Sequence, residues 1–211
     1  MKISHQFARI FHPEHLHAPK GITPVLGKQP LYFEIGAGKG KHALLFAEQN
    51  PDCTLIAVER THEKFAAFDK QLKTANLANL QAIHADAIAF AVHFLPPKSL
   101  AGVFILYPNP EPHNKNQRFV NMPFFEFLLS RMQPNATITI ASNIESYIDE
   151  ASQMLVETWR LPFVKKSIES SSARTHFEIK YLARGEHCQE LVISKPADYR
   201  TRFDDFMPNA L

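Results

Sequence analysis

The sequence predicts an α/β protein with a mostly parallel sheet. Between residues 31 and 159, short apolar runs alternate with amphipathic segments of helical length. Such alternation is typical of βαβ units, in which helices cover both faces of a parallel sheet. A glycine-rich turn, GAGKG at residues 36–40, follows the first apolar run. After residue 160 the alternation stops, which indicates an antiparallel addition to the sheet.

The predicted strands are short apolar runs, and the segments between them have one apolar side. Strands are expected at residues 31–36, 54–59, 80–85, 102–107 and 137–142. Helices are expected at residues 42–49, 61–76, 87–95, 123–132 and 144–159. In the second helix Phe65, Phe68 and Leu72 share one side, as expected of a helix that packs on a sheet. Each strand is thus followed by a helix that returns the chain for the next parallel strand.

The C-terminal part is predicted to complete the sheet with a hairpin. Residues 175–195, THFEIKYLARGEHCQELVISK, contain two strand-like runs on either side of a glycine at position 185. Glycine between polar residues is a turn signal. Residues 1–30 lack periodicity and are expected to form an irregular arm with at most one short helix, and residues 196–211 a loose tail. No linker interrupts the chain, so a single domain over residues 1–211 is expected.

Length and composition fit a globular protein. The 211 residues are 45% hydrophobic and 21% charged, and a chain of this length buries a sizeable core. No apolar run approaches the roughly 20 residues of a membrane helix, and the N-terminus lacks the apolar core of a secretory signal. Cys53 and Cys188 are far apart in sequence. This excludes a disulfide framework and favours the reducing cytoplasm.

Histidines are concentrated in the N-terminal arm, where they are candidate metal ligands. His12 and His15 have helical spacing, as two ligands on one helix face would. Pro13 between them argues against a rigid helical site, so no metal is expected. The net charge of +2 is compatible with a nucleic-acid partner but does not require one.

The glycine-rich turn is the first candidate for a ligand site. The stretch EIGAGKG at residues 34–40 joins a strand to a helix, and this junction lies at the carboxyl edge of the sheet, where α/β proteins bind ligands. Gly36 and Gly38 allow a ligand to approach the backbone closely. The pattern is GxGxG, which differs from the GxGxxG of dinucleotide-binding proteins.

Three acids at the ends of the first three strands indicate which cofactor is bound. Glu34 precedes the glycines, where a carboxylate would repel a diphosphate but accept from an amino group. Glu59 ends the second strand, where an acid binds ribose hydroxyls. Asp86 follows the third strand and could accept from the amino group of adenine. These acids favour S-adenosylmethionine over NAD. The alternative is that each acid caps the helix that follows it.

Together these features resemble the class I S-adenosylmethionine-dependent methyltransferase fold. That fold is Rossmann-like, with a mostly parallel seven-stranded sheet and a C-terminal antiparallel hairpin. The resemblance narrows to the tRNA (guanine-N7-)-methyltransferase family at three stretches: YPNPEPHNKNQRF at 107–119, Ser142-Asn143, and Thr175-His-Phe-Glu178. In that family the first stretch reads roughly PDPWPKKRHxKRR, the second Thr-Asp, and the third TxFE. The match covers about residues 31–195.

The resemblance implies a role for each matching residue. It implies cofactor contacts for Glu34, Gly36, Gly38, Glu59 and Asp86, substrate contacts for Lys115, Asn143, Thr175 and Glu178, and catalytic positions at Asn109 and Asn143. A carboxylate such as that of Glu178 can accept from both N1–H and the 2-amino group of guanine, a donor pair that adenine lacks. The implied partner is tRNA, with no membrane involved and a monomer or homodimer as the assembly.

The sequence departs from the family pattern at the substrate side. Two family aspartates are replaced by their isosteric amides, Asn109 and Asn143, and the family tryptophan by Glu111. Asn109-Pro110 also partly matches the (N/D)PP(Y/W) motif of methyltransferases that act on exocyclic amino groups. The candidate phosphate contacts are Lys39, Lys41, His113, Lys115, Arg118, Lys165, Lys166 and Arg174.

The resemblance implies methyl transfer from S-adenosylmethionine to N7 of a guanine in tRNA. Two alternatives stay open because of the two amides. One is a methyltransferase of the same scaffold that acts on another substrate. The other is a catalytically silent, RNA-binding relative.

Overall fold

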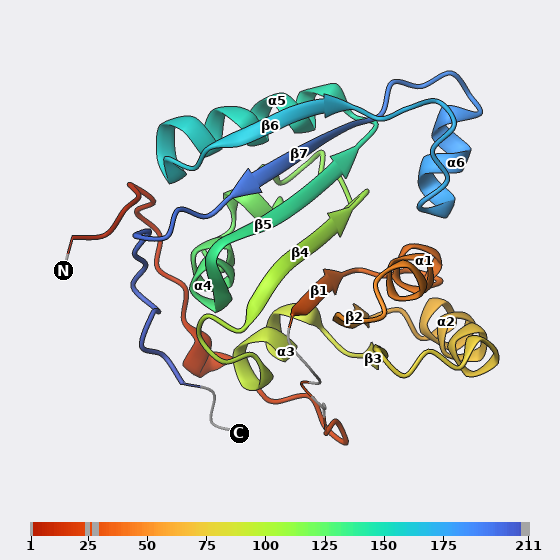
Figure 1. Cartoon of the computed structure of the whole chain (residues 1–211). Coiled ribbons are helices and arrows are strands. Elements are labelled where there is room, and N and C mark those ends of the chain that lie inside the picture. Colours follow the sequence, from red (N-terminus) through yellow and green to blue (C-terminus); the bar gives the residue numbers. More distant parts are fainter. Residues whose placement is uncertain (1, 24–25, 27–29, 208–211) are drawn as a thin grey trace.

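Seven strands form one mixed sheet within the part of the chain that the structure describes (Figure 1). The computed structural model describes residues 2–23, 26 and 30–207. The strand order is β3-β2-β1-β4-β5-β7-β6, and the neighbours from β3 to β5 are parallel. The strand bounds are β1 Leu31–Ile35, β2 Thr54–Glu59, β3 Leu80–His84, β4 Leu100–Leu106, β5 Met132–Ser142, β6 Phe163–Ser167 and β7 Gln189–Ser194. The predicted α/β class and mostly parallel sheet are confirmed.

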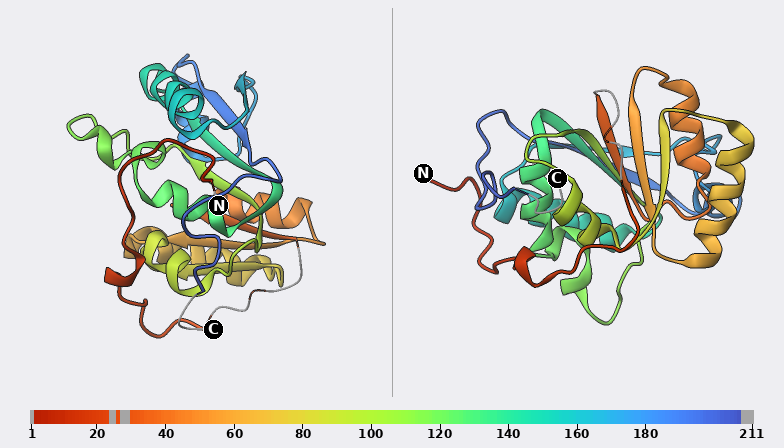
Figure 2. Two further views of the ribbon diagram at one scale, coloured as in Figure 1. Left: turned by 90° about the vertical axis from the view of Figure 1, so that its left-hand side faces the viewer. Right: turned by 90° about the horizontal axis from the view of Figure 1, so that it is seen from below.

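Helices cover both faces of the sheet (Figure 2). Their bounds are α1 Lys41–Gln49, α2 His62–Ala75, α3 Ala87–Phe94, α4 Phe124–Arg131, α5 Glu145–Met154 and α6 His176–Leu182. One buried cluster joins α1 and α2 to the sheet through Ala43, Ala47 and Phe68. The other includes Phe90 of α3 and Tyr147 of α5. Of the helices in the described residues, none combines the length and the apolar character that crossing a membrane requires.

The central strands are buried because both of their faces are covered. All six residues of β2, TLIAVE, are buried, as is typical of a parallel strand between two helix layers. In β4, Gly102 lies beneath the ring of Tyr32, and a Cβ there would be 2.7 Å from that ring. The glycine therefore lets the tyrosine of the neighbouring strand cross over it. Because β1 to β5 are parallel, their carboxyl ends lie at the same edge of the sheet.

The predicted C-terminal hairpin is correct in architecture and in its second strand, β7, but wrong in the location of its first strand. Strand β7 pairs antiparallel with both β5 and β6, but β6 is Phe163–Ser167, and the predicted strand THFEIKYL is helix α6. The alternation of Phe177 and Ile179 indicated a strand with one buried face. Instead these two side chains are 42% and 39% exposed, and Glu178 between them is buried. Thr175 caps the helix, with its Oγ1 accepting from the backbone N–H of Glu178 at 2.9 Å.

The prediction of a loose C-terminal tail is wrong for residues 196–207. Tyr199 is 4% exposed, and its hydroxyl donates to the carbonyl of Trp159 at 2.6 Å. Arg202 bonds to the buried Glu126 of α4, with 2.8 Å between Nε and Oε2. Residues 208–211 of the predicted tail lie outside the described residues. Residues 196–207 therefore belong to the packed body of the molecule.

The N-terminal arm runs beside this tail (Figure 2). The backbone N–H of Ser4 donates to the carbonyl of Arg200 at 3.0 Å. His5 adds a second contact, with its Nε2 2.8 Å from Glu126 Oε1. Farther along, the arm contains one short 3₁₀ turn, Pro13–His15. The two termini are thus joined across α4.

Candidate active site

One cavity lies at the carboxyl ends of the strands, between the turn after β1 and the start of α6. Its volume is about 320 Å³, a size typical of small-molecule pockets. Helix α6 lies opposite α1 across this end of the sheet (Figure 1). The lining residues are Glu34, Gly36, Ala37, Gly38, Lys39, Lys41, His42, Lys64, Leu106, Thr175, His176 and Phe177. Because open α/β sheets bind ligands at this edge, the cavity is the candidate active site.

Glycines build the turn from β1 to α1. Gly36 and Gly38 have φ values of 76° and 60°, in the left-handed region that favours glycine. A Cβ added to either would meet no atom within 4 Å, so the backbone there is open to a ligand. Gly40 differs, because a Cβ there would lie 2.0 Å from Cδ2 of Phe68. Gly40 is therefore required by the packing of α2, whereas Gly36 and Gly38 leave space beside the backbone.

Glu59 fixes the glycine turn. Its side chain is buried at the end of β2. Oε2 accepts from the backbone N–H of Gly38 at 2.8 Å, and Oε1 accepts from that of Thr61 at 2.7 Å. Each carboxylate oxygen retains a further lone pair. The predicted ribose contact thus has a carboxylate held rigidly beside the cavity, and the contact itself stays a prediction.

Glu34 is paired with a histidine that the sequence reasoning did not select. Both side chains are buried, and Glu34 Oε2 lies 3.0 Å from His42 Nδ1. The imidazole also meets the ring of Phe104 edge-on, with 4.7 Å between centroids. A carboxylate this deep needs such a partner. The signal for His42 was its place in the first turn of α1, directly after GKGK.

Asp86 takes the structural role that the sequence left open as its alternative. Its Oδ1 accepts from the backbone N–H groups of Ile88 and Ala89, at 2.9 and 3.0 Å. It therefore caps the N-terminus of α3. The side chain is exposed and is not among the residues that line the cavity. A contact with adenine stays a prediction.

Thr175 and Glu178 both lie at the start of α6, but their side chains point to different surroundings. Thr175 lines the cavity, but Glu178 points into the protein and is fully buried. Glu178 accepts from the hydroxyl of Tyr107 at 2.9 Å, from the hydroxyl of Ser172, and from Arg174 Nη2 at 2.9 Å. These donors join α6, the loop before it and the end of β4. The predicted contact with guanine would compete with these bonds.

The same network sets the protonation of Glu178. Burial alone would raise its pKa, but the hydrogen bonds from Arg174 and Ser172 outweigh burial and hold the pKa below its ordinary value. Arg174 also reaches Glu190 of β7, with 2.8 Å between Nη1 and Oε2. Burial raises the pKa of Tyr107, which stays a hydrogen-bond donor. The carboxylate of Glu178 is therefore charged and fixed in position by its hydrogen bonds.

Each asparagine that replaces a family aspartate donates to a glutamate. Asn109 Nδ2 lies 2.8 Å from Glu111 Oε1, and Asn143 Nδ2 lies 2.6 Å from Glu186 Oε2. A carboxylate only accepts, so the amide nitrogen must face it. Neither asparagine lines the cavity. A negative charge is thus present beside both positions, carried by a neighbouring residue.

Several predicted phosphate contacts are neutralised by acids of the same chain. Lys115 Nζ lies 2.7 Å from Glu150 Oε2, and Arg118 Nη1 lies 3.0 Å from the same atom. Arg118 is also buried and donates to the carbonyl of Pro110 at 2.7 Å. Lys165 pairs with Asp149 at 2.7 Å. These cations hold loops and helices together, so a role in binding RNA would require each to exchange its partner.

Comparison with known proteins assigns the family. Residues 28–191 match a family model described as "Putative methyltransferase". The chain is 31% identical over 187 residues to a tRNA (guanine-N(7)-)-methyltransferase of Dechloromonas aromatica, covering 84% of this chain and 74% of that protein. The chain belongs to the tRNA (guanine-N7-)-methyltransferase family. The predicted family is therefore confirmed.

Other relatives bear out the fold but are matched over part of their length. A second family member, from Nitrosospira multiformis, is 32% identical over 129 residues, which is 60% of this chain and 56% of that protein. The chain thus spans little more than half of that relative. Among solved structures, the 16S rRNA methyltransferase KamB aligns with a TM-score of 0.62 and 16% identity, over 80% of this chain and 89% of that one. This likeness supports the class I methyltransferase fold.

The site of this family member is only partly recognisable from sequence. The structure brings together Glu34, Gly36, Gly38 and Thr175 around one cavity, and it holds Glu59 against the turn. It leaves the other predicted site residues outside the lining, namely Glu59, Asp86, Asn109, Lys115, Asn143 and Glu178. Lining residues that sequence reasoning missed are His42, Lys64, His176 and Phe177. Lys64 is part of no recognised motif in the sequence. It lines the cavity from α2, a different element from the glycine turn and from α6.

Proposed function

We propose that this protein transfers a methyl group from S-adenosylmethionine to N7 of a guanine in tRNA. One observation carries the proposal: the glycine turn after β1 and the Thr175-His-Phe stretch, which are far apart in sequence, line the same cavity. These are the two stretches that resemble the cofactor and substrate motifs of the family. Family membership supports the same activity.

The residues at the β1 end of the cavity fit S-adenosylmethionine. Gly36 and Gly38 leave open space next to their backbone, and the cavity volume of about 320 Å³ suits a ligand of this class. The buried carboxylate of Glu34 would hold the ammonium group, and that of Glu59 the ribose hydroxyls. When bound, the cofactor supplies a methyl group activated by a sulfonium.

Methyl transfer to guanine N7 requires mainly that the reacting atoms be aligned. Guanine N7 carries a free lone pair at neutral pH, so no base has to remove a proton before attack. The chain must hold N7 in line with the methyl group and exclude water. It also has to stabilise the positive charge that the purine acquires. Carboxylates that would serve this purpose are those of Glu111 and Glu186, which accept from Asn109 and Asn143.

A second methyl acceptor is the competing candidate, and Glu178 is the observation that favours it. Both oxygens of Glu178 already accept from protein donors: Oε1 from Ser172 and Arg174, and Oε2 from Tyr107 and Arg174. The N1–H and 2-amino donors of guanine would need a different carboxylate or a rearranged network. An acceptor without that donor pair would not.

The test uses the purified chain, isotopically methyl-labelled S-adenosylmethionine and tRNA that lacks N7-methylguanosine. The tRNA is digested and its labelled nucleosides are identified. Labelled N7-methylguanosine supports the proposal. A different labelled nucleoside, or no label while calorimetry shows cofactor binding, would assign the chain to another acceptor. Absence of both label and cofactor binding would contradict methyltransferase activity altogether.

A further inference from the structure

We infer that the rim of the cavity is a polynucleotide-binding surface in which Lys39, Lys41 and Lys64 contact phosphates and Phe177 stacks on a nucleobase. We call these four residues the rim. The inference rests on the proposed function, because it assigns the part of the chain that would grip the RNA substrate. These RNA contacts would lie at the starts of α1, α2 and α6. The loop after β4, which carries the basic run in the family, lies elsewhere.

The three lysines of the rim are available to an external anion. All three line the cavity, and within the described part of the chain none forms an ion pair. This sets them apart from Lys115 and Arg118, which share Glu150. These basic residues thus differ in their partners. Lys115 and Arg118 are neutralised by an acid of the same chain, whereas the three lysines of the rim lie at the cavity.

The location of two of these lysines is unfavourable without a partner. Lys41 is the first residue of α1, and no acid stands in that first turn. Lys64 lies in the first turn of α2, next to Glu63, with which it forms no ion pair in the described residues. Helix N-termini carry positive partial charge, so cations there are disfavoured. A bound phosphate would reverse this penalty, since it is attracted by the lysines and the helix ends together.

Phe177 supplies the flat surface that a base requires. It is 42% exposed at the start of α6 and lines the cavity. Its ring stacks on Tyr181 with 6.0 Å between centroids and 18° between planes. Tyr181 in turn packs against Tyr107, at 5.8 Å between centroids. The exposed ring is thus held rigid from behind, as an aromatic platform for bases must be.

The combination favours a polynucleotide over a small anion. Lysines that follow phosphates, combined with an aromatic ring that stacks on a base, are the usual means of binding unpaired strands without reading their sequence. A single anion, such as the carboxylate of the cofactor, would use one lysine and would leave Phe177 uncovered. The occupant we assign is an unpaired nucleotide of RNA with its flanking phosphates.

The experiment measures RNA binding separately from catalysis. The affinity for a fluorescently labelled tRNA transcript is determined by anisotropy between about 50 and 200 mM salt, in the range where phosphate contacts dominate affinity. In the triple variant K39Q/K41Q/K64Q, the slope of log affinity against log salt should fall by about 2, at roughly 0.7 per lost contact. Phe177→Ala should weaken binding by roughly 5- to 150-fold, and Phe177→Tyr should restore it.

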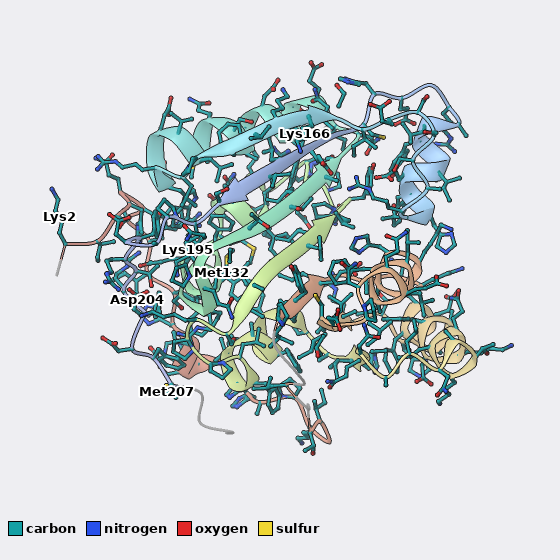
Figure 3. All side chains as sticks on the ribbon, viewed as in Figure 1. Lys2, Met132, Lys166, Lys195, Asp204 and Met207 are labelled. Atoms are coloured by element: carbon teal, nitrogen blue, oxygen red, sulfur yellow. The ribbon has the colours of Figure 1, made fainter. Side chains whose placement is uncertain are left out.

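A matched triple variant controls for charge. K2Q/K20Q/K70Q removes the same charge at exposed positions, of which Lys2 lies far from α1 and α6 (Figure 3). Its slope should stay close to that of the unmodified chain. Equal slopes for both triples would overturn the inference. So would intact RNA binding in either rim variant combined with loss of cofactor binding by calorimetry, since the rim would then serve the cofactor.

The outcomes separate this inference from the proposed function. A chain that binds RNA through the rim but labels another nucleoside keeps the inference and loses the guanine assignment. A chain that forms N7-methylguanosine, and whose rim triple retains the full salt slope, keeps the function and loses the inference.

Discussion

At the scale of single residues, each asparagine that replaces a family aspartate is hydrogen-bonded to a glutamate. Asn109 is bonded to Glu111 at 2.8 Å, so a return to the family aspartate is not neutral. Asn109→Asp places two carboxylates in contact and should destabilise the loop by about 0.5–1 kcal/mol. Methyl transfer by this variant should fall. The double variant N109D/E111Q exchanges the acid and the amide, so that one carboxylate and one donor are again in contact. It should recover methyl transfer. Higher activity in the single variant would contradict this account.

Glu178 gives a pH-dependent prediction. Its pKa is held below the ordinary value of 4.5 by Arg174, Ser172 and Tyr107, in spite of burial. A lowered native pKa stabilises the fold fully above pH 4.5, and this stabilisation is lost as the pH falls through the native pKa. Glu178→Gln should therefore lower the free energy of unfolding near pH 7 by about 2 kcal/mol.

Urea unfolding between pH 3 and 7 tests this prediction. The difference between the unmodified chain and Glu178→Gln should shrink toward low pH. A constant difference would show that the loss comes from packing rather than charge. The bonds made by Glu178 could not be foreseen from sequence, because its partners lie directly after β4 and in the loop before α6.

At the scale of elements, the glycines of the β1–α1 turn separate packing from ligand access. Gly40→Ala places Cβ 2.0 Å from the ring of Phe68 and adds left-handed strain, so it should cost about 2–4 kcal/mol of stability. Gly38→Ala meets no atom within 4 Å and should cost only about 1 kcal/mol. Thermal unfolding distinguishes the two. Equal losses would mean that α2 can move aside.

The elements also show how far the sequence could be interpreted. The strands from β1 to β4 and the helices α1 to α5 were predicted within a few residues, because apolar periodicity reports directly on their burial. Two elements near the C-terminus were not. In β6 four of the five residues are exposed, so the strand has no apolar signature. Helix α6 turns its apolar Phe177 and Ile179 outward, and this imitates the alternation of a strand.

At the scale of the whole molecule, the terminal segments are joined at one buried carboxylate. Glu126 is fully buried and is bonded by His5 and Arg202. Arg202→Met removes the guanidinium from that carboxylate, which keeps His5 and the backbone N–H of residue 202, and the free energy of unfolding should fall by about 3 kcal/mol. Arg200→Met removes a peripheral ion pair of 3.9 Å and should cost less than about 1 kcal/mol. Chemical denaturation of both variants checks this, and similar losses would argue against a joint at Glu126.

The strand order has a consequence for how the protein is made. Of the seven strands in the described residues, β7 is the last in the sequence, yet it lies between β5 and β6. In the described part of the chain, β6 pairs with no other strand. A nascent chain that ends before Gln189 therefore exposes the edge of β5 and leaves β6 without a partner. The sheet closes only after β7 has been synthesised, and until then the nascent chain exposes an unpaired edge to chaperones and to neighbouring chains.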